Sequence, residues 1–155
     1  MSMTTTLQKY LAENGVAYDI LPHSATSSCL SAANSTHING HMVAKPVILE
    51  DETGYLMAVI PATEHVQVSK LNRILDRDMI LAREDELKDL FSDCDVGAIP
   101  PIGSAYGVQS IIDDDLLECS DIYFEAGNHR ELVHIKGHDF QRLMRGAPHS
   151  KITLH

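Results

Sequence analysis

The chain is poor in aromatic residues, in positive charge and in cysteine. Its 155 residues include no tryptophan, and aromatic residues make up 5% of the total. The 12 lysine and arginine residues stand against 22 acidic residues, which gives a net charge of −10. Because binding to a nucleic-acid backbone needs clustered cations, this balance excludes a general nucleic-acid coat protein.

Cysteine usage and hydrophobicity limit the class of protein further. Cys29, Cys94 and Cys119 are widely separated and odd in number, so they indicate neither a disulfide framework nor a zinc site. No apolar run approaches the length of a membrane span, and residues 1–6 have neither the basic nor the apolar region of a signal peptide. We therefore expect a cytoplasmic protein with no membrane contact and no cofactor.

Nine histidines raise the question of a metal site. His37 and His41 are four residues apart, as are His134 and His138. However, a glycine lies between the members of each pair, so neither pair keeps two imidazoles on one helix face. The sequence does not favour a bound metal.

The length and an apolar content of 44% suit a single domain, residues 1–155, with one sizeable core. Periodicity and turn residues predict helices over 4–14, 24–34, 69–75 (with Ser69 as the N-cap), 84–91 and 138–145. Strands are predicted over 17–21, 42–49, 55–60, 79–82, 107–112, 122–125 and 132–135. The expected fold class is α+β: one compact domain with a curled, barrel-like mixed sheet and flanking helices.

The segment from Gly97 to Gly103 carries the strongest local signal. It reads Gly-Ala-Ile-Pro-Pro-Ile-Gly, with two glycines, two adjacent prolines and no charge. Proline fixes φ, and glycine reaches conformations that other residues avoid, so this segment predicts a stiff, shaped loop. Such a loop can direct backbone N–H groups at a ligand. The alternative is a plain structural turn between two elements.

A charge inside an apolar strand is the second unusual feature. Lys45 lies within residues 42–49, where the other positions on both faces are apolar. Its side chain either reaches to the surface or points into a cleft where the ammonium group meets an anion. Pro46 cannot donate to a strand ladder, so we expect a sheet edge or a bulge beside Lys45.

These features occur together, in the same order, in one known family. The chain resembles the YbaK / prolyl-tRNA-synthetase-associated editing domain family along nearly its whole length, with Gly97 and Pro101 matching the GxxxP signature. The matching segments are residues 22–24, 43–49, 55–62, 81–87, 91–103 and 124–132. One departure is Pro46, since many members of the family have threonine after the strand lysine.

The resemblance implies a free-standing, metal-independent deacylase. Such proteins hydrolyse the ester of a mischarged aminoacyl-tRNA, with a small amino acid such as Ala, Cys or Ser on tRNA for proline. The bound part is the 3′-terminal aminoacyl-adenosine. By the resemblance, the GxxxP loop holds the ester carbonyl, and Lys45 holds the terminal adenosine or its phosphate. The implied catalytic residues are Lys45, Gly97 and Pro101, and the implied substrate-binding residues are Ala98, Ile99, Pro100, Gly103 and His129.

Other interpretations stay open. The main alternative function is a non-catalytic module that binds aminoacyl-tRNA or a small ligand and docks on a synthetase. His129 follows a turn and is alternatively an exposed turn residue, whereas Cys94 is either a nucleophile or a small buried hydrophobe. The five bases of the C-terminal end form either a basic patch or a solvated face; they are Arg130, Lys136, Arg142, Arg145 and Lys151.

Overall fold

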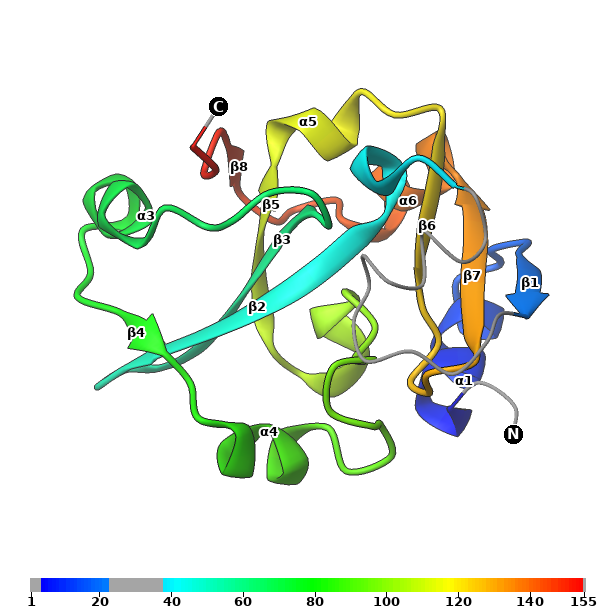
Figure 1. Ribbon diagram of the computed structural model, residues 1–155, viewed down its shortest axis with the longest axis horizontal. Helices are drawn as coiled ribbons and strands as arrows, with labels where there is room; N and C mark the ends of the chain where they lie inside the picture. Colours follow the sequence, from blue (N-terminus) through cyan, green and yellow to red (C-terminus); the bar gives the residue numbers. More distant parts are fainter. Residues whose placement is uncertain (1–3, 23–37, 155) are drawn as a thin grey trace.

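Two β-sheets with short helices around them form the framework of the protein (Figure 1). The computed structural model describes residues 4–22 and 38–154, so the helix predicted over 24–34 lies outside the described residues. One sheet has three strands in the order β1-β7-β6, and the other has five in the order β4-β2-β3-β5-β8. The strands are β1 (Asp19–Pro22), β2 (Ala44–Asp51), β3 (Gly54–Pro61), β4 (Ile80–Leu81), β5 (Gln109–Asp113), β6 (Asp121–Glu125), β7 (Glu131–Lys136) and β8 (His149–Ser150).

The helices are short and lie between the strands. The α-helices are α1 (Thr5–Glu13), α3 (Val68–Leu75), α4 (Glu84–Leu90), α5 (Asp114–Leu117) and α6 (Gly137–Leu143), and the 3-10 helices are η1 (Gly40–Met42) and η2 (Gly103–Tyr106). None of the helices among the described residues is long and apolar enough to cross a membrane.

The hairpin of β2 and β3 runs through the centre of the larger sheet. Its antiparallel register continues from Ala44 opposite Pro61 to Asp51 opposite Gly54 without an inserted residue. Of the two alternatives expected beside Lys45, an edge or a bulge, the bulge is therefore absent. The expected edge is confirmed, because β4 pairs with β2 only at Leu49 and Glu50 and leaves the Lys45–Pro46 part of β2 with β3 alone.

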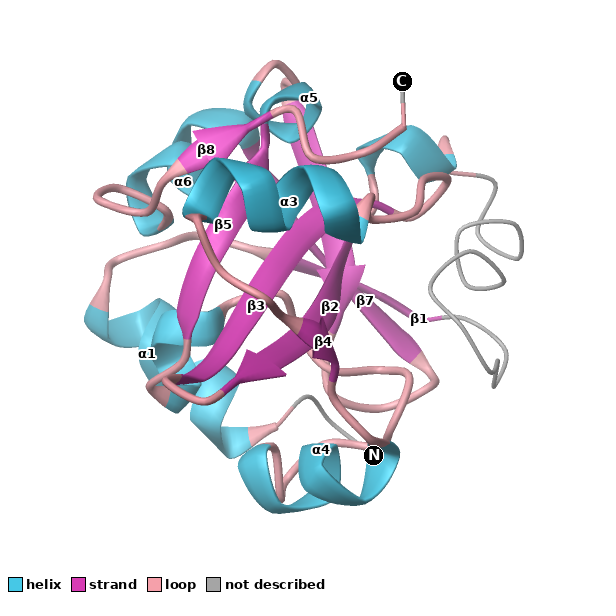
Figure 2. Cartoon of the chain, turned by 90° about the vertical axis from the view of Figure 1, so that its left-hand side faces the viewer, coloured by secondary structure: helices cyan, strands magenta, loops and turns pink. Residues whose placement is uncertain are grey.

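The core lies on both faces of this hairpin. Met57 and Val59 point into a large cluster shared with α1, β6, β7 and α6, whereas Leu56, Ala58 and Ile60 pack on the opposite face with Leu71. Leu71 belongs to α3, the helix that crosses in front of the larger sheet in Figure 2. A strand covered on both faces needs apolar residues at successive positions, which explains the unbroken run 56–60.

The α+β class is confirmed, but the sheets do not close into a barrel. Within the described residues they meet at one isolated parallel bridge, between Val43 and Tyr123. Tyr123 belongs to β6, so the bridge brings the start of β2 alongside that strand, as Figure 1 shows. This crossing places Lys45 near the smaller sheet.

Most predicted elements within the described residues are present, with ends shifted by one or two residues. The predicted N-cap at Ser69 is wrong. The N-cap position of α3 is Gln67, whose side chain makes no capping hydrogen bond. The two-residue β8 and the four-residue α5 were not predicted, because elements this short carry no readable periodicity.

Candidate functional site

The loop from Gly97 to Pro101 is fixed by main-chain hydrogen bonds to the turn between β6 and β7. The Asp95 N–H donates to the Gly127 carbonyl at 2.8 Å, and the Gly127 N–H donates back to the Ala98 carbonyl at 2.9 Å. A further bond from the Ala98 N–H to the Asp95 carbonyl, at 3.0 Å, closes the loop on itself. These bonds hold the predicted stiff loop in one place before any ligand arrives.

The same loop leaves two main-chain donors open. Within the described residues, the N–H groups of Gly97 and Ile99 donate to no acceptor. Gly97 is exposed and has a φ of +90°, in the left-handed region that favours glycine. Because main-chain donors are normally satisfied, two open ones on a rigid loop are available to a ligand oxygen.

His129 lies directly against the loop. Its Nε2 is 2.9 Å from the Val96 carbonyl oxygen, which can only accept, so Nε2 carries the proton. Its Nδ1 is buried and has no hydrogen-bond partner within the described residues. The ring is thus oriented by the loop and partly buried, rather than being an exposed turn residue.

Lys45 reaches this region from the neighbouring sheet. Its partly buried side chain donates from Nζ to the Ala62 carbonyl at 3.2 Å. The isolated parallel bridge between Val43 and Tyr123 lies two residues before Lys45 in one segment and two residues before Glu125 in the other. Lys45 therefore lies beside β6, the strand that leads into the turn bearing His129.

Glu125 is the residue that sequence reasoning missed. It is a carboxyl group with no exposed surface, at the end of β6. Burial raises its pKa to about 8, because the charged form loses solvation. An acid in an otherwise buried strand, between Phe124 and Ala126, was the signal in the sequence.

The remaining loop residues are buried. Ala98 and Ile102 have no exposed surface, and Ile99 joins the large core cluster. A Cβ on Gly103 would lie 2.5 Å from Ser110 Oγ and 2.6 Å from the Val108 carbonyl oxygen. This packing gives Gly103 a structural role, and any contact that these side chains make with substrate stays a prediction.

Cys94 lies behind the loop in a hydrogen-bonded group. Its Sγ is 3.1 Å from the Tyr106 hydroxyl, which donates to Asp93 Oδ1 at 2.9 Å. Burial raises the pKa of the Cys94 thiol to about 12. A thiol of this kind is protonated at neutral pH, which favours the buried hydrophobe over the nucleophile.

The C-terminal bases do not form one continuous basic patch. Lys136 pairs with Asp121, Arg142 with Asp139 and Lys151 with Asp115. Only the other two of the five, Arg130 and Arg145, make no ion pair within the described residues. Local carboxylates therefore neutralise most of this end of the chain.

Within residues 4–22 and 38–154, no three His, Cys, Asp or Glu side chains gather closely enough to hold a metal ion. His134 Nε2 is 2.8 Å from Asp121 Oδ1 and its Nδ1 is 3.1 Å from Asp19 Oδ2, and its ring stacks on Tyr123. The histidine pair 37/41 is only half within the described residues. Four cavities lined by described residues have none of Lys45, the loop 97–101 and His129 in their linings.

The fold and the loop define a class: an α+β domain that presents main-chain donors on a preorganised loop. The aminoacyl-tRNA editing domain family matches residues 23–143, which is most of the chain. The chain therefore belongs to the aminoacyl-tRNA editing domain family, as its resemblance to the YbaK group led us to expect. Among curated proteins, none matches its sequence.

Solved structures share the fold at low identity. A candidate trans-editing enzyme for prolyl-tRNA synthetase is 19% identical, with a TM-score of 0.83 over 97% of this chain and 96% of its own. A hypothetical protein is 20% identical, with a TM-score of 0.84 over 96% and 99%. A candidate signal-transduction protein from Marinobacter aquaeolei VT8 is 18% identical, with a TM-score of 0.79 over 99% of this chain and 31% of its own. At these identities the likeness concerns the fold alone.

Proposed function

We propose that this protein is a trans-editing deacylase that removes a small amino acid from mischarged tRNA. One observation carries the proposal: a rigid loop with open N–H groups at Gly97 and Ile99, docked on the turn that bears His129. Membership of the aminoacyl-tRNA editing domain family supports the substrate class. The amino acids we expect are Ala, Cys or Ser, on tRNA for proline.

Hydrolysis of an aminoacyl ester needs little help from side chains, because the ester is already activated. Water adds to the carbonyl carbon, the bond to the ribose oxygen breaks, and that oxygen leaves with a proton. Charge develops on the carbonyl oxygen, where the Gly97 and Ile99 N–H groups would stabilise it. One such donor contributes about 3 kcal/mol in well-studied hydrolases. The neighbouring ribose hydroxyl would help to position the water.

The two side chains have separate roles in this proposal. Lys45 would hold the terminal adenosine or its phosphate, since an ammonium group is a strong point-charge donor to phosphate. His129, with Nε2 engaged by the Val96 carbonyl, would hold the loop in place beside the bound substrate. Pocket walls would exclude larger amino acids by steric clash, which discriminates better than the ~1–3 kcal/mol of a missing methylene.

The decisive experiment is a deacylation panel. Purified protein at catalytic concentration is mixed with alanyl-, cysteinyl-, seryl- and prolyl-tRNA for proline, and release of amino acid is followed. We expect multiple turnovers for at least one small mischarged amino acid and none for prolyl-tRNA. Binding without release, with or without a synthetase, would instead support the non-catalytic module.

A further inference from the structure

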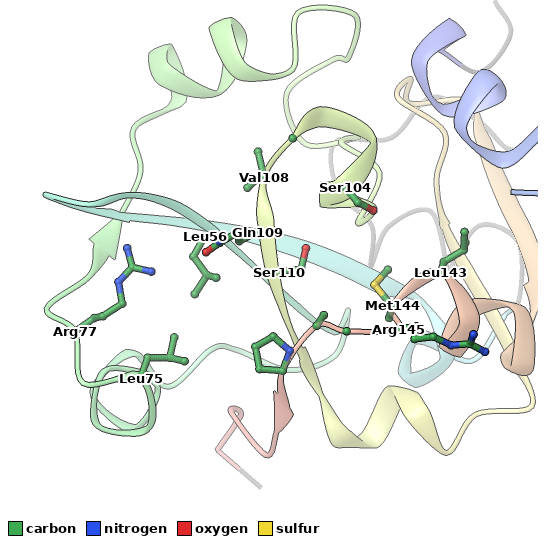
Figure 3. A pocket seen from close by; sticks show the side chains of 14 residues that line it. Leu56, Leu75, Arg77, Ser104, Val108, Gln109, Ser110, Leu143, Met144 and Arg145 are labelled. Atoms are coloured by element: carbon green, nitrogen blue, oxygen red, sulfur yellow. The ribbon is translucent and has the colours of Figure 1, made fainter. Parts of the chain in front are cut away.

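A cavity lies on the larger sheet, away from the candidate editing site (Figure 3). Its volume is about 580 Å³, within the roughly 300–1,000 Å³ typical of small-molecule sites. It lies between β5 and the segment that joins α6 to β8, residues 144–148. None of Lys45, the loop 97–101 or His129 lines it. We call it the β5-edge pocket, and the lining used below is Leu56, Arg77, Ser110, Met144, Arg145 and Pro148.

The pocket contains an open piece of strand edge. β5 pairs with β3 from Gln109 to Ile112, but β8 covers the other edge of β5 only at Ile112 and Asp113. There the Ile112 N–H donates to the Pro148 carbonyl at 3.0 Å. Main-chain groups of successive strand residues alternate between the two edges, so those of Ser110 face the same edge as those of Ile112.

No strand lies beside Ser110 on that edge within the described residues. Its N–H and carbonyl also take part in none of the main-chain hydrogen bonds made outside the strands. An unpaired donor and acceptor in strand geometry form a template for another extended amide. The pocket thus offers the N–H and the carbonyl of Ser110 to the main chain of a bound peptide.

The walls are apolar and the charge at the rim is positive. Leu56 and Met144 are buried side chains that face the cavity, and no carboxylate lines it. Arg77 and Arg145 lie at opposite ends of the labelled residues in Figure 3. Asp51 already holds Arg77, whereas Arg145 is exposed and makes no ion pair within the described residues. The rim of the pocket is therefore locally positive, although the protein has a net charge of −10.

We propose that the β5-edge pocket binds a free, short, apolar peptide-like carboxylate. Its amide pairs with the open edge at Ser110, its apolar side chains pack against Leu56 and Met144, and its carboxylate meets Arg145. The lining lacks aromatic rings on which bases could stack, which argues against a nucleotide chain. A fatty acid would leave the edge at Ser110 unused.

The test uses N-acetyl-leucyl-leucine and two matched probes, followed by calorimetry. One probe is the C-terminal amide, which lacks the charge, and the other carries an N-methyl group on the internal amide. We expect the carboxylate to bind about tenfold more tightly than the neutral amide, the size of one charge-assisted hydrogen bond. N-methylation should weaken binding by a similar factor, since it removes the edge donor.

Variants locate the site. Arg145→Gln should abolish the preference for the carboxylate over the amide, whereas Arg73→Gln, an exposed arginine outside the pocket, should keep it. Ala147→Phe should fill the cavity and weaken all three probes. Should that variant fold poorly, amide NMR shifts in the wild-type protein give the same information, and we expect them at residues 108–110 and 144–148.

Three results would overturn the proposal: no binding at millimolar peptide, equal affinity for carboxylate and amide, or shifts concentrated at residues 97–103 and Lys45. The last result would mean that the peptide enters the candidate editing site. Deacylation is not measured in these titrations, so failure of the editing proposal leaves this test intact.

Discussion

Strand β2 carries a charged residue near each end, and the two ends are built differently. At one end, Asp51 receives hydrogen bonds from Arg77 Nε at 2.6 Å and Nη2 at 2.5 Å, and from Thr53. The guanidinium of Arg77 lowers the pKa of the Asp51 carboxyl well below its usual range. At the other end, Lys45 donates to the neutral Ala62 carbonyl, where β4 no longer covers the strand.

The charged residues at the two ends of β2 serve different purposes. A two-point fork between arginine and carboxylate fixes geometry and satisfies both groups at once, so the Asp51 end serves the fold. A hydrogen bond from an ammonium to a main-chain carbonyl does not fix a two-point geometry, and in our proposal the Lys45 end meets the substrate. Substitutions at the two ends should therefore affect different measurements.

The largest expected effect is at the Lys45 end. Lys45→Ala should lower deacylation by about a hundredfold, comparable to removing one oxyanion donor. It should keep the fold, because the Lys45 side chain is only partly buried and lies where β4 no longer pairs with β2. Single-turnover rates and thermal unfolding measure the two quantities. An active variant, or one that unfolds, would contradict a role for Lys45 in the site.

Glu125, at the end of β6, should make stability depend on pH. Its pKa of about 8 in the folded protein lies above the usual value of 4.5, so the folded state holds the proton more tightly than the unfolded state does. Stability should then fall as pH rises from about 4.5 to about 8, by up to about 5 kcal/mol. Denaturant unfolding of Glu125→Gln should lose this slope, and an unchanged slope would assign it to other groups.

Gly97→Ala should lower deacylation by about tenfold, because the new Cβ would lie where we propose that substrate approaches and the backbone would be strained at its φ of +90°. Gly146→Ala is the matched control, since Gly146 has φ +89°, close to the +90° of Gly97, and its added Cβ would meet nothing within 4 Å. Both variants should lose similar stability, and only Gly97→Ala should lose turnover. Equal kinetics for the two variants would reduce the loop to a structural turn.

The Asp51 end should respond in stability alone. Asp51→Asn should lower the melting temperature at neutral pH and leave deacylation unchanged. Because the pKa of Asp51 is lowered in the folded protein, its contribution is complete above about pH 4 and is lost only in strong acid. The melting temperatures of wild type and variant should therefore converge as the pH falls, and a constant gap would point to lost packing instead.

The smallest effect is expected at Cys94. With its pKa raised to about 12, the thiol should react slowly with iodoacetamide at pH 8, and Cys94→Ala should deacylate at nearly the wild-type rate. Rapid labelling, or a large loss of turnover, would restore Cys94 as a nucleophile.

The sequence predicts best where local chemistry decides the outcome. The β2–β3 hairpin follows from two apolar runs around Thr53-Gly54, and α1 follows from one apolar stripe with Thr4 as its cap. Strand β8 has two residues and exists because it pairs in parallel with Ile112 and Asp113, more than thirty residues earlier. The local periodicity of the sequence does not predict a pairing between segments so far apart.

The candidate site likewise has one part that the local sequence predicts and one part that it does not. The stiffness of the Gly97–Pro101 loop was predictable from its glycines and prolines. Its bonds to Gly127 and the ring of His129 depend on segments about thirty residues apart, so only resemblance to a family brought them together beforehand. The complete burial of Glu125 likewise arises from tertiary packing, and the local sequence marks it only as an acid between Phe124 and Ala126.

The exchange of main-chain bonds between Asp95, Ala98 and Gly127 has a consequence for mutational scanning. A substitution replaces a side chain and leaves the peptide groups of the loop in place. A saturation library should therefore show Gly97 and Gly127 as sharply intolerant positions. Neighbouring exposed side chains, such as Ser92, should accept most replacements. Such a profile would distinguish a site that acts through main-chain groups from one that depends on a reactive side chain.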